Sequence, residues 1–466
     1  MTQRTEEHST GSINTLEDAI VVIRTLVAEN QELRAEIARL KKDSSTSSKP
    51  PSSDITKPEH ERKQSGVRKQ GGQVGHKGHT RQAFPAERID RRVSLKQKQC
   101  DDCHKKLKPT GEIKLQQVAE LVPNPVVVTE YMNHEMLCSC CGKKYYKELP
   151  DGVVEGLLLG VRLQTFIGYL KGHLGSSYSE IQELAADALG ISLSRSHLCT
   201  TVMRLSSALK GPHEDIGQAI KQAPSVNIDE TGWYDQGERL WTWLFCNSRF
   251  AFFSIEDTRS TEVLKKVLGE TFSGAITSDF YSAYICYACP KQQFCLAHLI
   301  RELKFLLTLP CERTKRFGEV VLSCFKRLFK LWHNKTDLDA LQKSAKRLRR
   351  RLFMYILSTK TPAGDATRIA KRLSKHWDSL FRFVDEPTLY EPTNNRAERI
   401  LRFMVRIRRH TQGSRSKTGQ RWAERIFSVL ATCRLQGRSA WAFLLHCMQA
   451  QISGDSCPVL SIPLII

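Results

Sequence analysis

The chain has 466 residues, which is long enough for two to four domains with a sizeable core. Lysine and arginine exceed aspartate and glutamate by 22, so we expect a polyanionic partner, with nucleic acid the first candidate and an anionic membrane surface the second. No run of about 18 or more apolar residues occurs, which excludes a spanning helix, and residues 1–8 lack an apolar signal core, which predicts a cytoplasmic protein.

Residues 1–42 predict a leucine-zipper-like coiled coil. Apolar residues alternate three and four apart, as at the a and d positions of heptads, and Thr15 is the expected N-cap. Asn30 falls at an a position, where one buried polar residue favours two parallel strands. An amphipathic helix packed on its own domain is the alternative. The predicted seam is Leu16, Ala19, Ile23, Leu26, Asn30, Leu33, Ile37 and Leu40.

Residues 43–85 predict a Ser/Pro linker followed by a basic glycine-rich segment. The stretch 43–54 is too polar and too rich in proline to fold. In residues 67–81 glycines allow close approach of the backbone, and interleaved cations can neutralise phosphates. A flexible solvated spacer explains the same composition. The candidate DNA contacts are Arg68, Lys69, Lys77 and Arg81.

Residues 86–155 predict a zinc ribbon. Two Cys-x-x-Cys pairs suit a closed, structural Zn²⁺ site with four thiolates, and the valine-rich segment 113–130 between them predicts short strands. Cys140 is a surplus thiol that could replace a member of the second pair. In a cytosolic chain, 15 cysteines are better explained as thiols and metal ligands than as disulfides. The candidate zinc ligands are Cys100, Cys103, Cys138 and Cys141.

Residues 156–222 predict a helical, helix-turn-helix-like DNA-binding domain. One helix ends at Gly190, and a second begins after Ser194, its expected N-cap. Two helices joined by a glycine-containing turn are typical of this motif, in which Arg195 and His197 would begin the recognition helix. A plain helical hairpin is the alternative.

Residues 223–300 predict the first part of an α/β core. The expected strands are 226–229, 241–246, 250–255, 275–278 and 293–295, with a helix at 261–268. The first and fourth strands each deliver an aspartate, Asp229 and Asp279, to a strand end. With three antiparallel strands followed by alternating helices and strands, the pattern is similar to an RNase H-like core, in which these two strands are neighbours.

Residues 301–390 predict a basic helical insertion that would form a lobe over the active site. In residues 391–430 a helix is expected to begin near Asn395, with Thr393 or Asn394 as its cap and Glu398 in its first turns. Arg402 is spaced for an ion pair with Glu398. The helix that carries Glu398 leads into a cationic run suited to binding the DNA backbone: Arg406, Arg408, Arg409, Arg415 and Lys417. Residues 431–466 predict only a helical tail.

Three carboxylates of this kind are what a two-metal phosphoryl-transfer site requires. Mg²⁺ prefers oxygen ligands, and two bound ions can activate an attacking oxygen and stabilise a leaving one. Taken singly, an aspartate that forms a turn and a glutamate that interacts with a helix dipole are common alternatives. The flanking residues therefore decide the interpretation.

These flanking motifs resemble the transposases of the insertion sequence 66 family. In chain order the motifs are Asp229-Glu-Thr-Gly-Trp233, Ser278-Asp-Phe-Tyr-Ser-Ala-Tyr284, Cys295-Leu-Ala-His298 and Asn394-Asn-Arg-Ala-Glu398. The resemblance covers nearly the whole chain, including the Ser/Pro linker, the basic glycine-rich segment and a zinc-binding module.

The resemblance implies a multidomain α/β transposase of the DDE type, in which Asp229, Asp279 and Glu398 hold two Mg²⁺ (or Mn²⁺) ions beside a separate structural Zn²⁺. Such an enzyme cleaves the ends of its element and joins them to target DNA. The implied partners are double-stranded DNA (terminal inverted repeats and target), further copies of the chain and companion proteins of the same element, at the bacterial nucleoid. The expected neighbours of the carboxylates are Thr231, Trp233, Tyr281, Cys295, His298, Asn394, Asn395 and Arg402.

Three alternatives stay open on the sequence. The protein could be a catalytically inactive zinc-ribbon DNA-binding regulator derived from a transposase, or a structure-specific nuclease that cleaves without joining. Cys286 and Cys289 could also combine with Cys295 and His298 in a second zinc site.

Overall fold

The computed structural model describes residues 15–43, 46, 83–110, 112–123, 125–333, 338–358 and 364–461. The chain divides into two compact units, and each is described by itself: one comprises residues 1–58, 132–184 and 192–466, and the other comprises residues 59–131 and 185–191. The basic glycine-rich segment lies outside the described residues, so the DNA contacts predicted there stay predictions.

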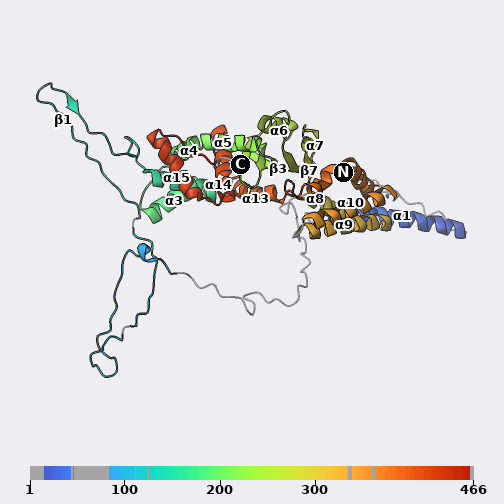
Figure 1. Cartoon of the computed structure of the whole chain (residues 1–466), viewed down its shortest axis with the longest axis horizontal. Helices are drawn as coiled ribbons and strands as arrows, with labels where there is room; N and C mark the ends of the chain where they lie inside the picture. Colours follow the sequence, from blue (N-terminus) through green and yellow to red (C-terminus); the bar gives the residue numbers. More distant parts are fainter. Residues whose placement is uncertain are drawn as a thin grey trace. The chain divides into compact units, whose positions relative to one another are not determined.

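The described elements mix helices with short strands, as the predicted α/β class requires (Figure 1). None of the helices in the described part of the chain is long and apolar enough to cross a membrane. In chain order the elements are α1 (Leu16–Leu40), η2 (Ala86–Arg88), β1 (Met136–Leu137), β2 (Lys144–Tyr145), α2 (Val161–Tyr169), η3 (Leu170–Leu174), α3 (Tyr178–Leu189), α4 (Arg195–Ala208), α5 (Lys210–Lys221), β3 (Ser225–Asp235), β4 (Glu238–Cys246), β5 (Ala251–Glu256), α6 (Thr261–Leu268), β6 (Ala275–Ser278), α7 (Ser282–Cys286), β7 (Gln292–Phe294), α8 (Leu296–Leu306), α9 (Glu312–His333), α10 (Leu338–Ser358), α11 (Asp365–Lys375), α12 (Trp377–Asp385), α13 (Asn395–Thr411), α14 (Lys417–Leu435) and α15 (Ala440–Ser453).

A five-stranded mixed sheet in the order β5-β4-β3-β6-β7 positions the candidate site. The hairpin-linked strands β3, β4 and β5 are antiparallel, whereas β6 and β7 run parallel to β3. The predicted adjacency of the first and fourth strands is confirmed, since Asn227 pairs with Thr277. Each of these residues lies two positions before an aspartate, so Asp229 and Asp279 leave the parallel ladder at the same level.

Helix α14 protects the edge strand β5. An uncovered edge strand presents unpaired backbone groups and invites aggregation. Polar side chains four residues apart on α14 accept hydrogen bonds from the outward backbone N–H groups of every second residue of β5. About one turn of the helix therefore matches two residues of the strand along this contact. The pairs are Glu424 with Ile255, Ser428 with Phe253 and Thr432 with Ala251, at 2.7, 2.8 and 3.0 Å.

Two hydrophobic cores support the sheet and the helical insertion. One lies between the sheet and helices α5, α6 and α7, around Trp243, Phe245 and Ile276. The other joins α8 to α12, as predicted for the insertion, and also contains Phe294 of β7. The Gln293 side chain donates to the backbone carbonyl of Leu380 and accepts the backbone N–H of Phe383, which fixes α12 to the sheet.

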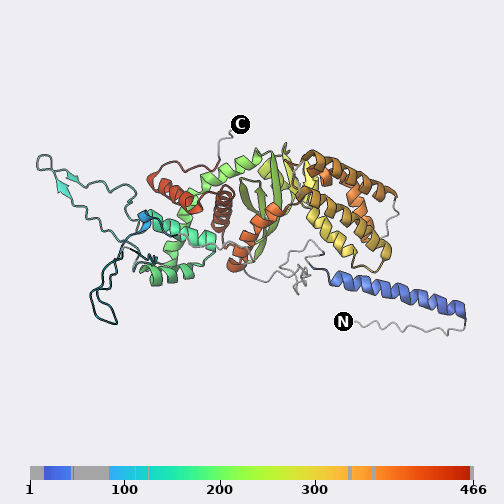
Figure 2. The ribbon, with the colours of Figure 1, turned by 60° about the horizontal axis from the view of Figure 1, so that its bottom comes forward.

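Helix α1, blue in Figure 2, confirms the predicted helix and its cap. Thr15 and Asp18 form a reciprocal capping box. No residue of α1 is buried, and only Ala35 and Ala38 pack against the core of the helical insertion. Its apolar seam is exposed, including Leu33, which is 59% exposed. Association with a second copy stays a prediction.

The predicted strands in residues 113–130 were wrong. No strand forms in the described residues 112–123 and 125–130, and the nearest pairing is the two-residue hairpin of β1 and β2. Pro123 and Pro125 have no backbone N–H and so cannot donate to a sheet ladder, which explains why a valine-rich composition alone misleads here.

Candidate active site

Strand β3 does not end at Asp229, contrary to the sequence interpretation. The strand continues to Asp235, and the turn lies at Gln236 and Gly237, both of which have positive φ. Thr231, Trp233 and Tyr234 have high strand propensity, and residues 229–235 pair with β4, which extends the hairpin. The parallel pairing of β3 with β6 does end near Asp229. The Asp229 carboxylate therefore lies at the border between the parallel and the antiparallel parts of the sheet.

The two aspartates are electrostatically coupled to each other and to Glu398. Desolvation raises the pKa of Asp229 well above its ordinary value, and the negative charges of Glu230, Asp279 and Glu398 raise it further. Desolvation, followed by the charge of Glu230, raises the pKa of Asp279 to about 6. In the described part of the chain neither aspartate forms an ion pair. This group of carboxylates would therefore be stabilised by a bound cation.

Asn394 holds the start of α13 against β3. It occupies the N-cap position, as predicted, but its side chain caps nothing in the helix. Instead, the Asn394 amide nitrogen donates to the carbonyl of Ile228 at 2.7 Å, and its amide oxygen accepts from Asn227 at 3.2 Å. One turn later comes Glu398, whose backbone N–H donates to the carbonyl of Asn394. These bonds fix Glu398 relative to the strand that carries Asp229, while Asn395 is exposed.

The predicted ion pair between Glu398 and Arg402 was wrong. Among the ion pairs of the described residues, Glu398 faces Arg301 of α8, with 3.5 Å between Nη2 and Oε1, while the Arg402 side chain is exposed. Helical spacing permits the pair along α13, but the contact with α8 turns the carboxylate in the other direction. Arg301 is a site residue that the sequence did not reveal.

Cys295 and His298 do lie beside the third carboxylate, as predicted. The His298 Nε2 atom is 4.0 Å from Glu398 Oε1, and the buried Nδ1 atom has no hydrogen-bond partner among the described residues. Burial, and secondarily the Arg301 charge, lowers the pKa of His298 to about 4, so the ring is neutral near pH 7. The Cys295 thiol accepts the Asn394 backbone N–H at 3.2 Å, and burial raises its pKa to about 11.

One potential metal-binding group in the described chain combines Cys295, His298 and Glu398, whose ligand atoms lie within 4.8 Å of one another. Cys286 and Cys289 are not part of it: Cys286 is exposed, and the Cys289 thiol donates to the carbonyl of Gly274. The alternative zinc site with four Cys and His ligands thus finds no support in this arrangement.

A group of charged and aromatic side chains around Glu230, which the sequence analysis did not identify, lies beside the carboxylates. Its side chain is 1% exposed and accepts hydrogen bonds from Arg259 and from the Tyr284 hydroxyl. The Arg259 guanidinium lies 3.8 Å from the centre of the Tyr281 ring, and the Tyr281 hydroxyl donates to the Arg259 carbonyl. The Tyr281 backbone N–H in turn donates to Asp279 at 2.9 Å. A chain of contacts therefore links Glu230 to Asp279. The only sequence signal was a second acid beside Asp229.

The cations that follow Glu398 do not share one environment. Arg408, predicted to contact DNA, donates to the hydroxyl of Thr231 at 3.1 Å and to the carbonyl of Gly232, and so ties α13 to β3. Trp233 is buried and donates to the Ser414 hydroxyl at 3.0 Å. The remaining cations of the run, Arg406, Arg409, Arg415 and Lys417, are exposed.

Helices α3 and α4 confirm the predicted helix boundaries. Ser194 caps α4 by accepting the His197 backbone N–H at 3.2 Å. Arg195 turns back onto α3, donating to Ser179 at 2.7 Å and to Gln182 at 3.3 Å. A role of Arg195 in reading DNA requires those bonds to open and stays a prediction.

Each cysteine pair forms the same local turn. In the first pair, the Cys100 N–H donates to the carbonyl five residues on, and the N–H of His104 donates back to Cys100. The pair at Cys138 repeats both bonds, with Gly142 in the place of His104, and both these residues have positive φ. Hydrogen bonds from the backbone lower the pKa of the leading thiol in each pair, with the largest contribution from the fourth residue of its turn, Cys103 or Cys141. This geometry selects Cys141 over Cys140 as the second thiol.

The chain matches known sequences over most of its length. A family model described as the transposase IS66 family matches residues 156–421, more than half of the chain, and a family of unknown function (DUF6444) matches residues 6–82. The uncharacterized protein y4hP of Sinorhizobium fredii (strain NBRC 101917 / NGR234) is 22% identical over 70% of this chain and 65% of its own length. The uncharacterized protein y4jO of the same organism is 30% identical over 20% of this chain and 29% of its own length. The chain thus covers less than two thirds of either relative.

Proposed function

Because the chain belongs to the IS66 family of transposases, we propose that it is a DDE-type DNA transposase that cleaves the ends of an insertion sequence and joins them to target DNA. The observation that carries the proposal is the electrostatic coupling of Asp229, Asp279 and Glu398, which come from β3, β6 and α13. The sheet order, with three antiparallel strands beside two parallel ones, supports an RNase H-like core. No residue of the chain is needed as a nucleophile.

The residues present fit divalent ions. All three carboxylates supply hard oxygen ligands, and burial together with neighbouring negative charges raises the pKa of the two aspartates, neither of which forms an ion pair with a described residue. Bound Mg²⁺ (or Mn²⁺) would supply Lewis acidity to both the attacking and the leaving oxygen of a phosphodiester. The chain contributes the positioning: Asn394 holds α13 on β3, Arg301 and neutral His298 orient the Glu398 carboxylate, and Tyr281 orients Asp279.

The reaction has two displacements at phosphorus. In the first, water attacks the phosphodiester at the end of the element, a P–O bond to the water oxygen forms, and the bond to the 3′ oxygen breaks as that oxygen gains a proton. In the second, the freed 3′-hydroxyl attacks a phosphodiester of target DNA, which forms the new strand junction and releases a target 3′ end.

We further propose that the four thiols Cys100, Cys103, Cys138 and Cys141 hold one structural Zn²⁺, and that α1 pairs with a second copy through its exposed seam. The matching turns of the two cysteine pairs and their lowered thiol pKa support the first proposal. The absence of any buried residue in α1 supports the second. DNA contact is assigned to the exposed basic segments.

A strand-joining assay tests the proposed function. Purified protein is incubated with Mg²⁺, a donor duplex labelled at the 3′ end of the element, and a supercoiled target, and the products are resolved on a sequencing gel. Cleavage followed by transfer of the label to target DNA is expected. Cleavage without transfer would instead identify a nuclease, and binding without cleavage would identify an inactive regulator.

A further inference from the structure

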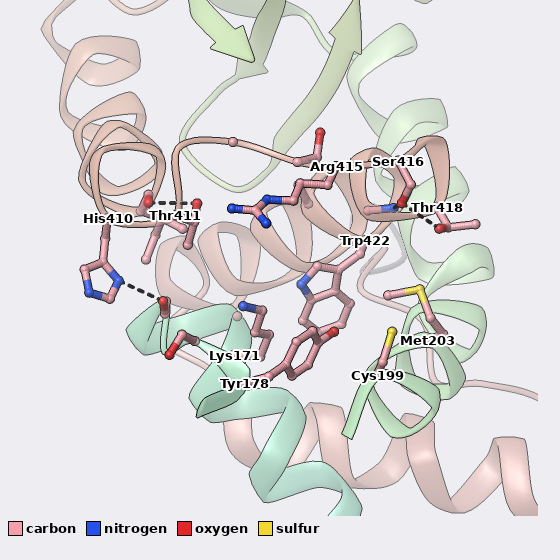
Figure 3. A pocket seen from close by; sticks show the side chains of 18 of the residues that line it. Lys171, Tyr178, Cys199, Met203, His410, Thr411, Arg415, Ser416, Thr418 and Trp422 are labelled. Atoms are coloured by element: carbon pink, nitrogen blue, oxygen red, sulfur yellow. Dashed lines mark hydrogen bonds between the residues drawn. The ribbon is translucent and has the colours of Figure 1, made fainter. Parts of the chain in front are cut away.

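A cavity of about 680 Å³ lies beside the far end of α13 and is not used by the proposed chemistry. Its walls come from η3, the start of α3, α4, the end of α13 and the first turns of α14 (Figure 3). Its volume falls in the range of about 300–1,000 Å³ that is typical of sites for small molecules. The cavity is therefore large enough for one nucleotide.

The lining combines cations with aromatic rings. Figure 3 shows the guanidinium of Arg415 and the ammonium of Lys171 directed into the same space as the rings of Tyr178 and Trp422. Arg415 forms no ion pair with any described residue, and its guanidinium donates no hydrogen bond to the described chain. Lys171 lies 4.6 Å from the centre of the Tyr178 ring and donates to the carbonyl of Ser176, which fixes both side chains.

One acid, Glu180, also lines the cavity and interacts with the charge of Lys171, whereas Arg415 has no acidic partner among the described residues. The Glu180 carboxylate accepts the backbone N–H of Ser177 at the start of α3 and faces His410 at 3.8 Å. Further polar groups come from the hydroxyls of Ser416 and Thr418, which lie 3.0 Å apart at the rim. Cations, hydroxyls and aromatic faces in one cavity match a ligand that has both a phosphate and a flat ring.

We propose that this cavity binds a single nucleotide, with its base against Tyr178 and Trp422 and its phosphate at Arg415 and Lys171. Stacking on aromatic side chains contributes about 1–3 kcal/mol per base and tolerates any base, because every base has a π-face. An arginine guanidinium forms charge-assisted hydrogen bonds with phosphate. The source of the nucleotide is a base extruded from the DNA duplex, and this assignment of the source rests on the proposed function.

The position of the cavity is suited to a nucleotide extruded from the DNA duplex. Glu398 and His410 lie on the same helix, twelve residues apart, which at the helical rise corresponds to about 18 Å. A duplex whose end reaches the carboxylates would pass the cavity roughly five base pairs from the reacting phosphate. Extrusion of a nucleotide there would anchor the DNA end in register with the catalytic residues.

The test compares two short duplexes of one sequence, one fully paired and one with a single unpaired 2-aminopurine. Binding is measured by anisotropy in a chelator with full-length Asp229→Asn protein, so that no cleavage occurs. We expect roughly tenfold tighter binding of the bulged duplex, with quenched 2-aminopurine fluorescence. Tyr178→Leu and Arg415→Ala should each remove most of this preference while changing the affinity for the paired duplex less than about threefold.

Matched controls separate the cavity from general cation effects. Lys417→Ala removes a cation two positions from Arg415 but outside the lining, and should weaken both duplexes equally. Tyr145→Leu removes an exposed tyrosine of β2 and should leave the preference intact. Equal binding of both duplexes by the parent protein, without any binding of deoxyadenosine monophosphate, overturns the inference and leaves the proposed function standing.

The remaining outcomes identify the source of the nucleotide and distinguish a failure of the cavity proposal from a failure of the proposed function. If deoxyadenosine monophosphate binds with the same dependence on Tyr178 and Arg415 while the duplexes bind equally, the cavity is a site for free nucleotides and the extruded base is excluded. If neither duplex binds at all, the proposed function fails, whereas mononucleotide binding can still be measured.

Discussion

The two regions proposed to bind metal, the three carboxylates and the cysteine pairs, differ in how their surroundings affect the charge of the ligands. Burial and like charges raise the pKa of Asp229 and Asp279, so the surroundings of these carboxylates oppose ionisation. In the cysteine pairs, backbone N–H groups lower the pKa of Cys100 and Cys138, so each turn favours a thiolate before metal arrives. The carboxylates are brought together by tertiary contacts, while each cysteine pair stabilises a thiolate within a turn of a few residues.

The difference indicates that metal binding and folding are related differently in the two regions. The three carboxylates lie on β3, β6 and α13, which pack through buried apolar residues, so an ion there would bind to a region that has its own hydrophobic core. The cysteine pairs lie in exposed chain with little core of its own, so a bound ion would contribute directly to the folding of that region.

The largest expected effect follows Glu398→Gln. The change keeps the size of the side chain but removes a ligand charge, so cleavage and joining should fall by roughly 10³-fold or more, because several kcal/mol of transition-state stabilisation depend on the ions. Asp229→Asn and Asp279→Asn should match it, while DNA binding, measured by anisotropy, should persist.

Glu391→Gln is the matched control for Glu398. Glu391 lies just before α13 and pairs with Arg396 at 2.5 Å, so its loss should alter activity only slightly. Glu424 is unsuitable for this purpose, since it is buried and caps the edge of the sheet. Substantial cleavage by Glu398→Gln protein would remove α13 from the proposed site.

The second largest effect is expected in the cysteine pairs. Cys141→Ser should lose bound zinc and the local turn, whereas Cys140→Ser should keep both, because the thiol of Cys141 is hydrogen-bonded to the leading thiol while Cys140 contributes only its backbone N–H. Zinc per chain, measured by mass spectrometry under reducing conditions, distinguishes the two variants. Retention of zinc by Cys141→Ser with loss in Cys140→Ser would exchange the two assignments.

Glu230→Gln should give an intermediate effect. The change removes the charge that holds Arg259 under the Tyr281 ring, and loss of such supporting contacts typically lowers metal affinity or activity by about 10–100-fold. The expected signature is an increase in the Mg²⁺ concentration for half-maximal cleavage in a protein that remains folded. Glu256→Gln, which breaks the ion pair between Glu256 of β5 and Lys266 of α6, should not shift that concentration.

The smallest effect concerns stability without metal. Asp279 has a folded-state pKa of about 6 against an ordinary value of 3.8, so its ionisation destabilises the folded chain as the pH rises from about 4 to 6. In a chelator at pH 7.5, Asp279→Asn should therefore raise the free energy of unfolding by roughly 3 kcal/mol, with no gain below pH 4. Denaturant titrations at both pH values measure this. A less stable variant at pH 7.5 would show that the carboxylate is compensated in some other way.

The sequence alone determined the features that depend on neighbours along the chain. Thr15 and Ser194 were identified as caps, since capping involves residues three positions apart. Strands β4 to β7 and helix α6 were predicted within a few residues, because their apolar patterns and flanking turns are local. The residues around the three carboxylates also sufficed to indicate the family.

Only the tertiary structure decided where polar groups find their partners. Asn394 looked like a cap but bonds to β3, Arg402 looked like a partner of Glu398 but Arg301 takes that place, and Arg408 looked free but is tied to β3. Each was misjudged because a side chain chooses among all groups within reach, and most of those are brought near only when distant segments pack. The Glu230 network and the nucleotide-sized cavity arise in the same way, from segments up to about 250 residues apart in the sequence that no local pattern connects.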